Sequence, residues 1–174
     1  GRGWGGRFGG GRGLGVCVCV AGGWSWGAEN ARVAAKVVAG LGSHADLPTT
    51  VYVYVTGRGI FRSEDAGEKW RLMDAGPRHK VLQVVHSNMP GSMQTGWFFA
   101  ATAKGVSRSM DCFCGWRDAG DLGQAVTAVA YDPQQPMWVY AASEAALSVS
   151  ADGGEHWSQA RSPGRRITAL VATP

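Results

Sequence analysis

The chain has 174 residues, of which 45% are hydrophobic and 17% are charged, and its formal net charge is +4. The hydrophobic content is sufficient for a folded core, and no apolar run is long enough for a membrane-spanning helix. The 27 glycines and the short valine-rich runs favour many strands joined by tight turns. We therefore predict an all-β protein.

Residues 1–14 are predicted to be a Gly/Arg-rich, low-complexity leader, and residues 15–174 to be the folded segment. Arg2, Arg7 and Arg12 stand near two aromatic residues, a composition found in RGG-like segments that bind RNA. We favour a disordered leader instead, because the stretch has no periodic apolar pattern, and we predict no nucleic-acid partner.

The four cysteines form two Cys-x-Cys pairs, Cys17 with Cys19 and Cys112 with Cys114. Thiolate pairs can bind zinc, but structural zinc sites usually use wider Cys-x₂₋₄-Cys spacings, and neither a third pair nor a histidine cluster accompanies these two. We predict ordinary thiols, no metal site and no cofactor.

Three eight-residue segments repeat Ser, Asp, Gly and Trp at fixed offsets, in the pattern S-x-D-x-G-x-x-W. We call them the first box (SEDAGEKW, 63–70), the second box (SMDCFCGW, 109–116) and the third box (SADGGEHW, 150–157). The second box has Phe113 in place of the glycine. The predicted structural box residues are Ser63, Asp65, Gly67, Trp70, Ser109, Asp111, Trp116, Ser150, Asp152, Gly154 and Trp157.

Strand-like segments surround each box in the same order. A first strand is expected from residues 31, 81 and 126, a second from 51, 97 and 139, and a third at 59–63, 105–109 and 146–150. The box then forms a turn, and its tryptophan begins a fourth strand. Tryptophan spacings of about 46 and 41 residues fit one four-stranded blade per repeat.

Partial blades are expected at both ends of these three complete blades. Residues 19–26 (CVAGGWSW) match the box register through Gly23 and Trp26, and the apolar segment from 167 would begin a further blade. A competing register matches the segment from residue 16 (VCVCVAG) with the second strand from residue 51. Both registers remain open at this end.

Over residues 31–174 the chain resembles the BNR or Asp-box β-propeller repeats of sialidases, xyloglucan-active glycosidases, the sortilin ectodomain and photosystem II assembly factors. The resemblance implies a β-propeller and an extracellular or organelle-lumen location. A propeller normally has four to eight blades, so we expect this chain to be a segment of a larger one. Its open edges would pair with missing blades or with another chain.

The box has a local physical explanation. An aspartate side chain can accept hydrogen bonds from backbone N–H groups of its own turn, and glycine permits a positive φ there. The three aspartates are therefore predicted to close turns rather than to act as catalytic carboxylates, because a role repeated in every blade is structural. The three tryptophans are predicted to be buried between sheets.

The resemblance implies that function lies on the loop face, which carries the connections between blades and the turns between second and third strands, with the boxes opposite. The candidate ligand-binding residues of this face are Arg58, Arg78, His79, Lys80, Lys104, Arg161, Arg165 and Arg166. The box face is mainly acidic. This polarity predicts an anionic partner, either an anionic glycan or an acidic protein surface, although solvated surface charge would give the same pattern.

An enzyme would need two carboxyl groups that face each other across the scissile bond. Asp118 and Asp121 are the only suitable carboxylate pair on the loop face, and the arginine motif of sialidases (Phe or Tyr, then Arg-Ile-Pro) is absent. We therefore predict no catalytic residue and a non-catalytic binding or assembly scaffold. The alternative is part of a sialidase- or xyloglucanase-like glycoside hydrolase.

Overall fold

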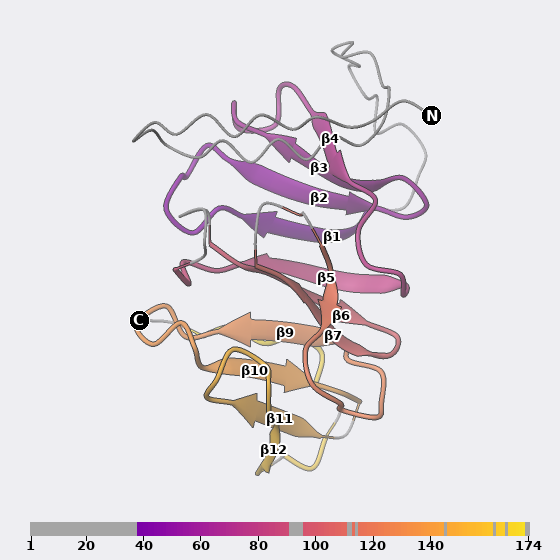
Figure 1. Ribbon diagram of the computed structural model, residues 1–174, viewed down its shortest axis with the longest axis vertical. Helices are drawn as coiled ribbons and strands as arrows, with labels where there is room; N and C mark the ends of the chain where they lie inside the picture. The colour runs from indigo at the N-terminus through magenta and orange to yellow at the C-terminus, as the bar shows by residue number, and fades with distance from the viewer. Residues whose placement is uncertain are drawn as a thin grey trace, which may run out of the picture.

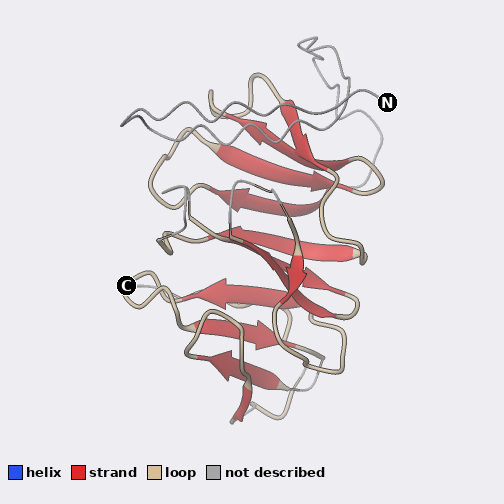
Figure 2. Cartoon of the chain, viewed as in Figure 1, coloured by secondary structure: helices blue, strands red, loops and turns tan. Residues whose placement is uncertain are grey.

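The computed structural model describes residues 38–90, 96–110, 113, 115–144, 146–161, 163–165 and 167–172. These residues form strands and loops without any helix (Figures 1 and 2). No segment of the described chain is thus a candidate for a membrane-spanning helix. The strands lie in three separate four-stranded sheets, which confirms the all-β prediction of three complete blades.

Each sheet is an antiparallel meander whose strands pair in chain order. Blade A contains β1 (Val38–Ser43), β2 (Val51–Val55), β3 (Gly59–Ser63) and β4 (Arg71–Asp74). Blade B contains β5 (Val81–His86), β6 (Phe98–Thr102), β7 (Gly105–Ser109) and β8 (Arg117–Asp118). Blade C contains β9 (Ala128–Tyr131), β10 (Val139–Ala142), β11 (Leu147–Ser150) and β12 (Ser158–Ala160).

Tight turns set the register between the second and third strands. In blade A the pairing runs from Val51↔Ser63 to Val55↔Gly59, which leaves only residues 56–58 for the turn. Gly57 within it has φ 71°, in the left-handed region that glycine adopts without a steric penalty. The β2–β3 and β10–β11 turns lie on one side of the molecule, and the β1–β2 and β9–β10 connections lie on the other (Figure 1).

The third strands of blades A and B have the bounds that the sequence predicts. The fourth strands differ, because each begins one residue after the box tryptophan and so does not contain it. The indoles of Trp116 and Trp157 instead donate hydrogen bonds to residues of the preceding blade. Residues 167–172 belong to none of the three sheets, and residues 1–37 lie outside the described chain, so the partial blades stay predictions.

The blades pack through apolar faces. Blades A and B enclose one buried cluster, which includes Tyr52, Ile60, Val81, Phe98 and Phe113. Blades B and C enclose another, made by Met89, Phe99, Ala101, Val106, Ala119, Val126, Val129, Val139 and Ala141. The first strands of successive blades, β1, β5 and β9, contact one another in that order. Burial of these residues between sheets is the main stabilising contribution to the arrangement.

Candidate functional site

The first box is a turn closed by its own side chains. The Ser63 hydroxyl donates to Asp65 Oδ1 at 2.8 Å and accepts the Gly67 N–H at 2.8 Å, and Asp65 Oδ1 accepts the Lys69 N–H at 2.9 Å. Hydrogen bonds from the Lys69 N–H and from Ser63 lower the pKa of Asp65. Gly67 has φ 101°, which a residue with a side chain rarely adopts.

The third box repeats this geometry. Ser150 Oγ donates to Asp152 Oδ1 at 2.7 Å, and Asp152 Oδ1 accepts the N–H groups of Glu155 and His156 at 2.9 and 3.0 Å. The His156 ring adds a contact of 2.7 Å to Asp152 Oδ2. The His156 N–H, the Ser150 hydroxyl and the His156 ring hold the pKa of Asp152 well below its usual value. Both carboxylates are thus engaged by their own turns.

In the second box, Asp111 and both cysteines, Cys112 and Cys114, lie outside the described residues. Phe113, at the glycine position, has φ 66° and is buried, with its ring centroid 4.3 Å from that of Phe98. A bulky residue in the left-handed region is strained by about 1 kcal/mol or more. Packing of the Phe113 ring between blades A and B offsets this strain.

Two box tryptophans reach back to the preceding blade. Trp116 Nε1 donates to Asp74 Oδ1 at 2.9 Å, at the end of β4, and Trp157 Nε1 donates to the Ala119 carbonyl at 2.7 Å, just after β8. Each bond satisfies the polar atom of a partly buried ring and ties one blade to the next.

Arg108 makes a second link between blades B and C. Its side chain is buried, donates to the Gly153 carbonyl at 2.6 Å, and forms an ion pair with Glu155, both in the third box. The guanidinium also stacks over the Trp97 ring, 5.4 Å from its centroid. A charged donor fixed in this way positions the third box against blade B.

The candidate ligand-binding residues of blades A and B lie in turns and connections between strands. Arg58 and Lys104 lie in the β2–β3 and β6–β7 turns, and Arg78, His79 and Lys80 lie between β4 and β5. The Ala103 N–H donates to the Lys80 carbonyl at 3.0 Å, which joins this connection to the β6–β7 turn.

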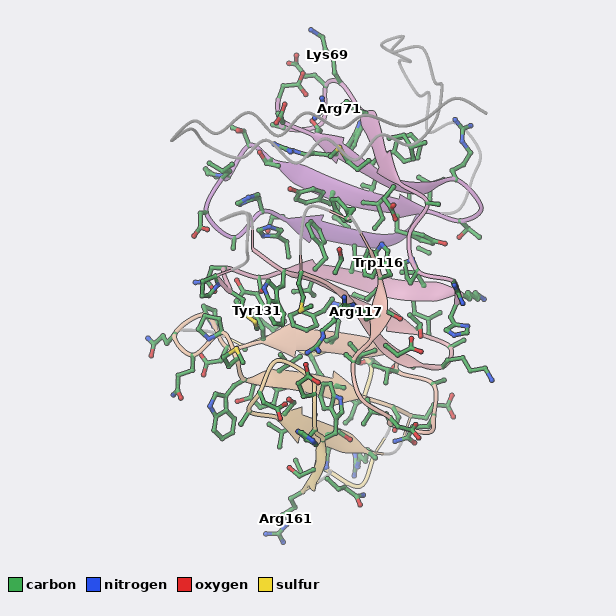
Figure 3. The ribbon with its side chains drawn as sticks, viewed as in Figure 1. Lys69, Arg71, Trp116, Arg117, Tyr131 and Arg161 are labelled. Carbon is green, nitrogen blue, oxygen red and sulfur yellow. The ribbon has the colours of Figure 1, made fainter. Side chains whose placement is uncertain are left out.

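The remaining loop-face cations belong to blade C. Arg161 projects outward past β12, at the end of the molecule opposite Lys69 and Arg71 (Figure 3). Arg165 is exposed beyond β12, and Arg166 lies outside the described residues. Arg161 is thus separate from the cations of blade A in the structure.

Carboxylates on the loop face are partly engaged by local bonds. Asp74 Oδ1 accepts the Gly76 N–H in addition to the Trp116 indole, and Asp121 Oδ1 accepts the Gly123 N–H. Asp118 Oδ1 accepts the Ser107 hydroxyl at 3.3 Å. The described residues contain no group of three or more His, Cys, Asp or Glu side chains that could hold a metal ion.

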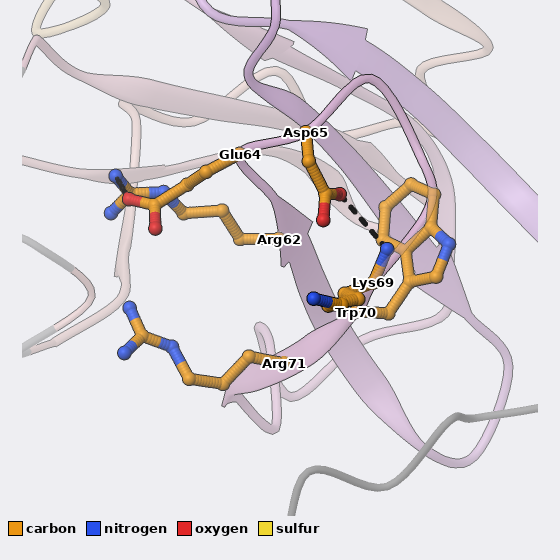
Figure 4. A pocket seen from close by; sticks show the side chains of 6 residues that line it. All are labelled: Arg62, Glu64, Asp65, Lys69, Trp70 and Arg71. Atoms are coloured by element: carbon orange, nitrogen blue, oxygen red, sulfur yellow. Dashed lines mark hydrogen bonds and ion pairs between the residues drawn. The ribbon is translucent and has the colours of Figure 1, made fainter.

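A pocket of about 220 Å³ lies beside the first box, lined by Arg62, Glu64, Asp65, Lys69, Trp70 and Arg71 (Figure 4). Arg62 and Arg71 are not among the candidate residues predicted from the sequence. A signal was present, because the first and second boxes are each preceded and followed directly by an arginine, whereas the third is not. The two arginines of each such pair lie opposite each other in the sheet, as Arg62↔Arg71 and Arg108↔Arg117.

No family model matches the chain, and no curated protein matches it in sequence. Solved structures do resemble it. A chain of a nidogen/laminin complex superposes with a TM-score of 0.62 at 13% identity, covering 78% of this chain and 52% of that one. An ancestral GH74 enzyme gives a TM-score of 0.59 at 15% identity, covering 74% of this chain and 18% of the enzyme.

YCF48 from Cyanidioschyzon merolae is also similar, with a TM-score of 0.53 at 16% identity over 71% of this chain and 37% of YCF48. At these identities the likeness shows the fold alone, which is that of a β-propeller. The chain spans from 18% to 52% of the length of these three structures.

Proposed function

We propose that this chain is a non-catalytic propeller scaffold that binds an acidic segment of a partner protein through its loop face. The supporting observation is the hydrogen bond between Ala103 N–H and the Lys80 carbonyl. It holds the connection that carries Arg78, His79 and Lys80 against the turn that carries Lys104. Clustered exposed cations attract an acidic segment and raise its association rate.

A protein partner is favoured over a glycan by two of the similar structures. One is a complex of nidogen with laminin, and another is YCF48 bound to D1 peptide, which has a TM-score of 0.54 at 17% identity, covering 71% of this chain and 40% of YCF48. The alternative, part of a glycoside hydrolase, draws on the likeness to the GH74 fold. It would require a carboxyl pair such as Asp118 and Asp121 to act on a glycosidic bond.

The test is the fluorescence anisotropy of a labelled octaglutamate peptide mixed with the parent protein at two salt concentrations. We expect saturable binding that weakens as salt rises, because exposed charges are screened over about 8–10 Å near physiological ionic strength. Arg78→Glu should weaken it strongly, and adding Lys80→Glu should weaken it further. Both side chains are exposed, and the Lys80 carbonyl bond survives the change.

The matched control is Arg117→Glu, the same charge reversal at an exposed residue of β8. Equal loss in the Arg78 and Arg117 variants would contradict the proposal. Tighter binding of an oligogalacturonide than of the peptide would assign the face to a glycan. Hydrolysis of a glycoside by the parent, lost in Asp118→Asn or Asp121→Asn, would favour the hydrolase.

A further inference from the structure

The arginines next to the first and second boxes occupy equivalent positions but have different partners. In blade B, Arg108 binds the Gly153 carbonyl and the Glu155 carboxylate of the following box. When the boxes are aligned on their Ser and Trp residues, Cys114 stands in the second box where Glu155 stands in the third. The corresponding arginine of blade A, Arg62, therefore has no carboxylate at that position of the following box.

Arg62 turns to its own box instead. It forms an ion pair with Glu64, two residues further along the chain, and its Nε atom, like that of Arg108, is buried without a hydrogen-bond partner among the described residues. Its neighbour across the ladder, Arg71, is exposed, and none of the described residues makes a hydrogen bond or ion pair with its guanidinium. Blade A thus presents two arginines on one pocket lining, of which Arg62 holds an exposed carboxylate and Arg71 holds none.

The lining of the pocket beside this pair carries positive charge that its own carboxylates do not neutralise. Of its two carboxylates, Glu64 is paired with Arg62, and Asp65 is engaged by the Ser63 hydroxyl and the Lys69 N–H. The Lys69 and Arg71 side chains have no such partner among the lining residues, and the Trp70 ring forms an apolar wall (Figure 4). A volume of about 220 Å³ is sufficient for one carboxylate-bearing side chain but not for a folded element.

We propose that this pocket binds the carboxylate of an aspartate or glutamate side chain from a partner polypeptide. Arg71 makes the first contact, and Arg62 makes the second after Glu64 moves away, so Glu64 acts as an internal competitor. The planar guanidinium matches a carboxylate with two parallel N–H donors. The model for the bound state is the Arg108–Glu155 pair of the same molecule.

This site lies at the first box rather than on the loop face, so it does not depend on the proposed function. A site of this kind would bind a single acidic side chain, whereas the affinity of the loop face would depend on the total negative charge of the partner. The two can therefore be tested with different probes.

The test uses the full chain and the capped tripeptide acetyl-Gly-Glu-Gly-amide, with acetyl-Gly-Gln-Gly-amide as the neutral control. Binding is followed through the indole N–H resonance of Trp70, which Trp70→Phe assigns. We expect a saturable shift with the Glu peptide and none with the Gln peptide. Arg71→Gln should weaken binding by about tenfold or more, as loss of a charged hydrogen bond does.

Three further variants make the test specific. Arg117→Gln removes the arginine at the same position of blade B, where Arg108 already has its acceptors, and should leave the titration unchanged. Glu64→Gln removes the competitor and should tighten binding severalfold, whereas Arg78→Glu should have no effect. An unchanged titration in Arg71→Gln, equal losses in the Arg71 and Arg117 variants, or weaker binding in Glu64→Gln would overturn the proposal.

Discussion

The indole Nε1–H of Trp157 donates a hydrogen bond of 2.7 Å to the carbonyl oxygen of Ala119, which fastens the third box to the end of blade B. Trp157→Phe keeps an aromatic ring and removes the donor, so we expect the free energy of unfolding to fall by about 1 kcal/mol. Urea unfolding measures the change. Trp138→Phe, at an exposed position between β9 and β10, is the control and should cost less; equal losses would contradict the role of the bond.

Arg108 and Arg62 should contribute unequally to stability. Arg108→Gln leaves the Gly153 carbonyl without its buried charged donor, and we expect a loss of about 2–3 kcal/mol. Arg62→Gln removes a pair between a half-buried side chain of β3 and the exposed Glu64 carboxylate, and should cost less than about 1 kcal/mol. Chemical denaturation of the two variants gives the comparison, and a larger effect at Arg62 would show that Arg108 does not hold the blades together.

Replacing two glycines with positive φ, Gly57 and Gly154, distinguishes the cost of backbone strain from the cost of a steric contact. Gly154 has φ 89°, and a Cβ there would lie 3.0 Å from the Ala119 Cβ; Gly57 has φ 71° and nothing within 4 Å of such an atom. Gly57→Ala should cost about 1 kcal/mol from the backbone alone. Gly154→Ala should cost a further 1–3 kcal/mol, roughly, from overpacking between blades B and C. Thermal or urea unfolding that ranks the two equally would contradict this contact.

Stability should depend on pH through His44. Its Nδ1 accepts the N–H groups of Asp46 and Leu47 at 3.0 and 3.2 Å, and its ring lies 4.0 Å from that of His86. The pKa of His44 is lowered overall, mainly by burial and to a smaller extent by the charge of Arg62, and the charge of Asp46 opposes this shift. The unfolded chain therefore binds this proton first, and stability should fall as the pH drops below about 6.5.

The replacement His44→Asn keeps an acceptor for the two N–H groups and removes the titration. We expect its free energy of unfolding to vary less between pH 7.5 and pH 5 than that of the parent. Urea unfolding of the parent and the variant at both pH values measures this difference. A parent and variant with the same pH dependence would assign the effect to another group.

The repeat itself was the most predictable part of the molecule. Ser63 and Asp65 recur at the same offsets as Ser150 and Asp152, and a box of this kind closes a turn through bonds within eight residues, so the sequence alone carries the information. The third strands that precede the first two boxes follow the same logic. Local hydrogen bonding does not depend on how the blades pack.

The contacts between blades were less predictable because they join residues about 40 positions apart. Nothing in the box pattern indicates that Trp116 reaches Asp74, or that Arg108 reaches Glu155, since these depend on how one sheet lies against the next. Arg71 lies opposite Arg62 in the β3–β4 register, which shifts between Ile60 and Phe61, so that Ile60 pairs with Asp74. The periodicity of the sequence does not predict a register shift of this kind.

The outer strands of blades B and C have a consequence for solubility. β8 contains only the charged pair Arg117 and Asp118, and β12 contains three residues, none of them a large hydrophobic one. An edge so short offers few backbone groups to an incoming strand, and burying its charges against a neighbour would be costly. Stacked sheets rich in valine are otherwise good templates for fibril growth. We expect β8 and β12 to pair poorly with a strand from a neighbouring molecule, which would limit strand-by-strand polymerisation at these two edges.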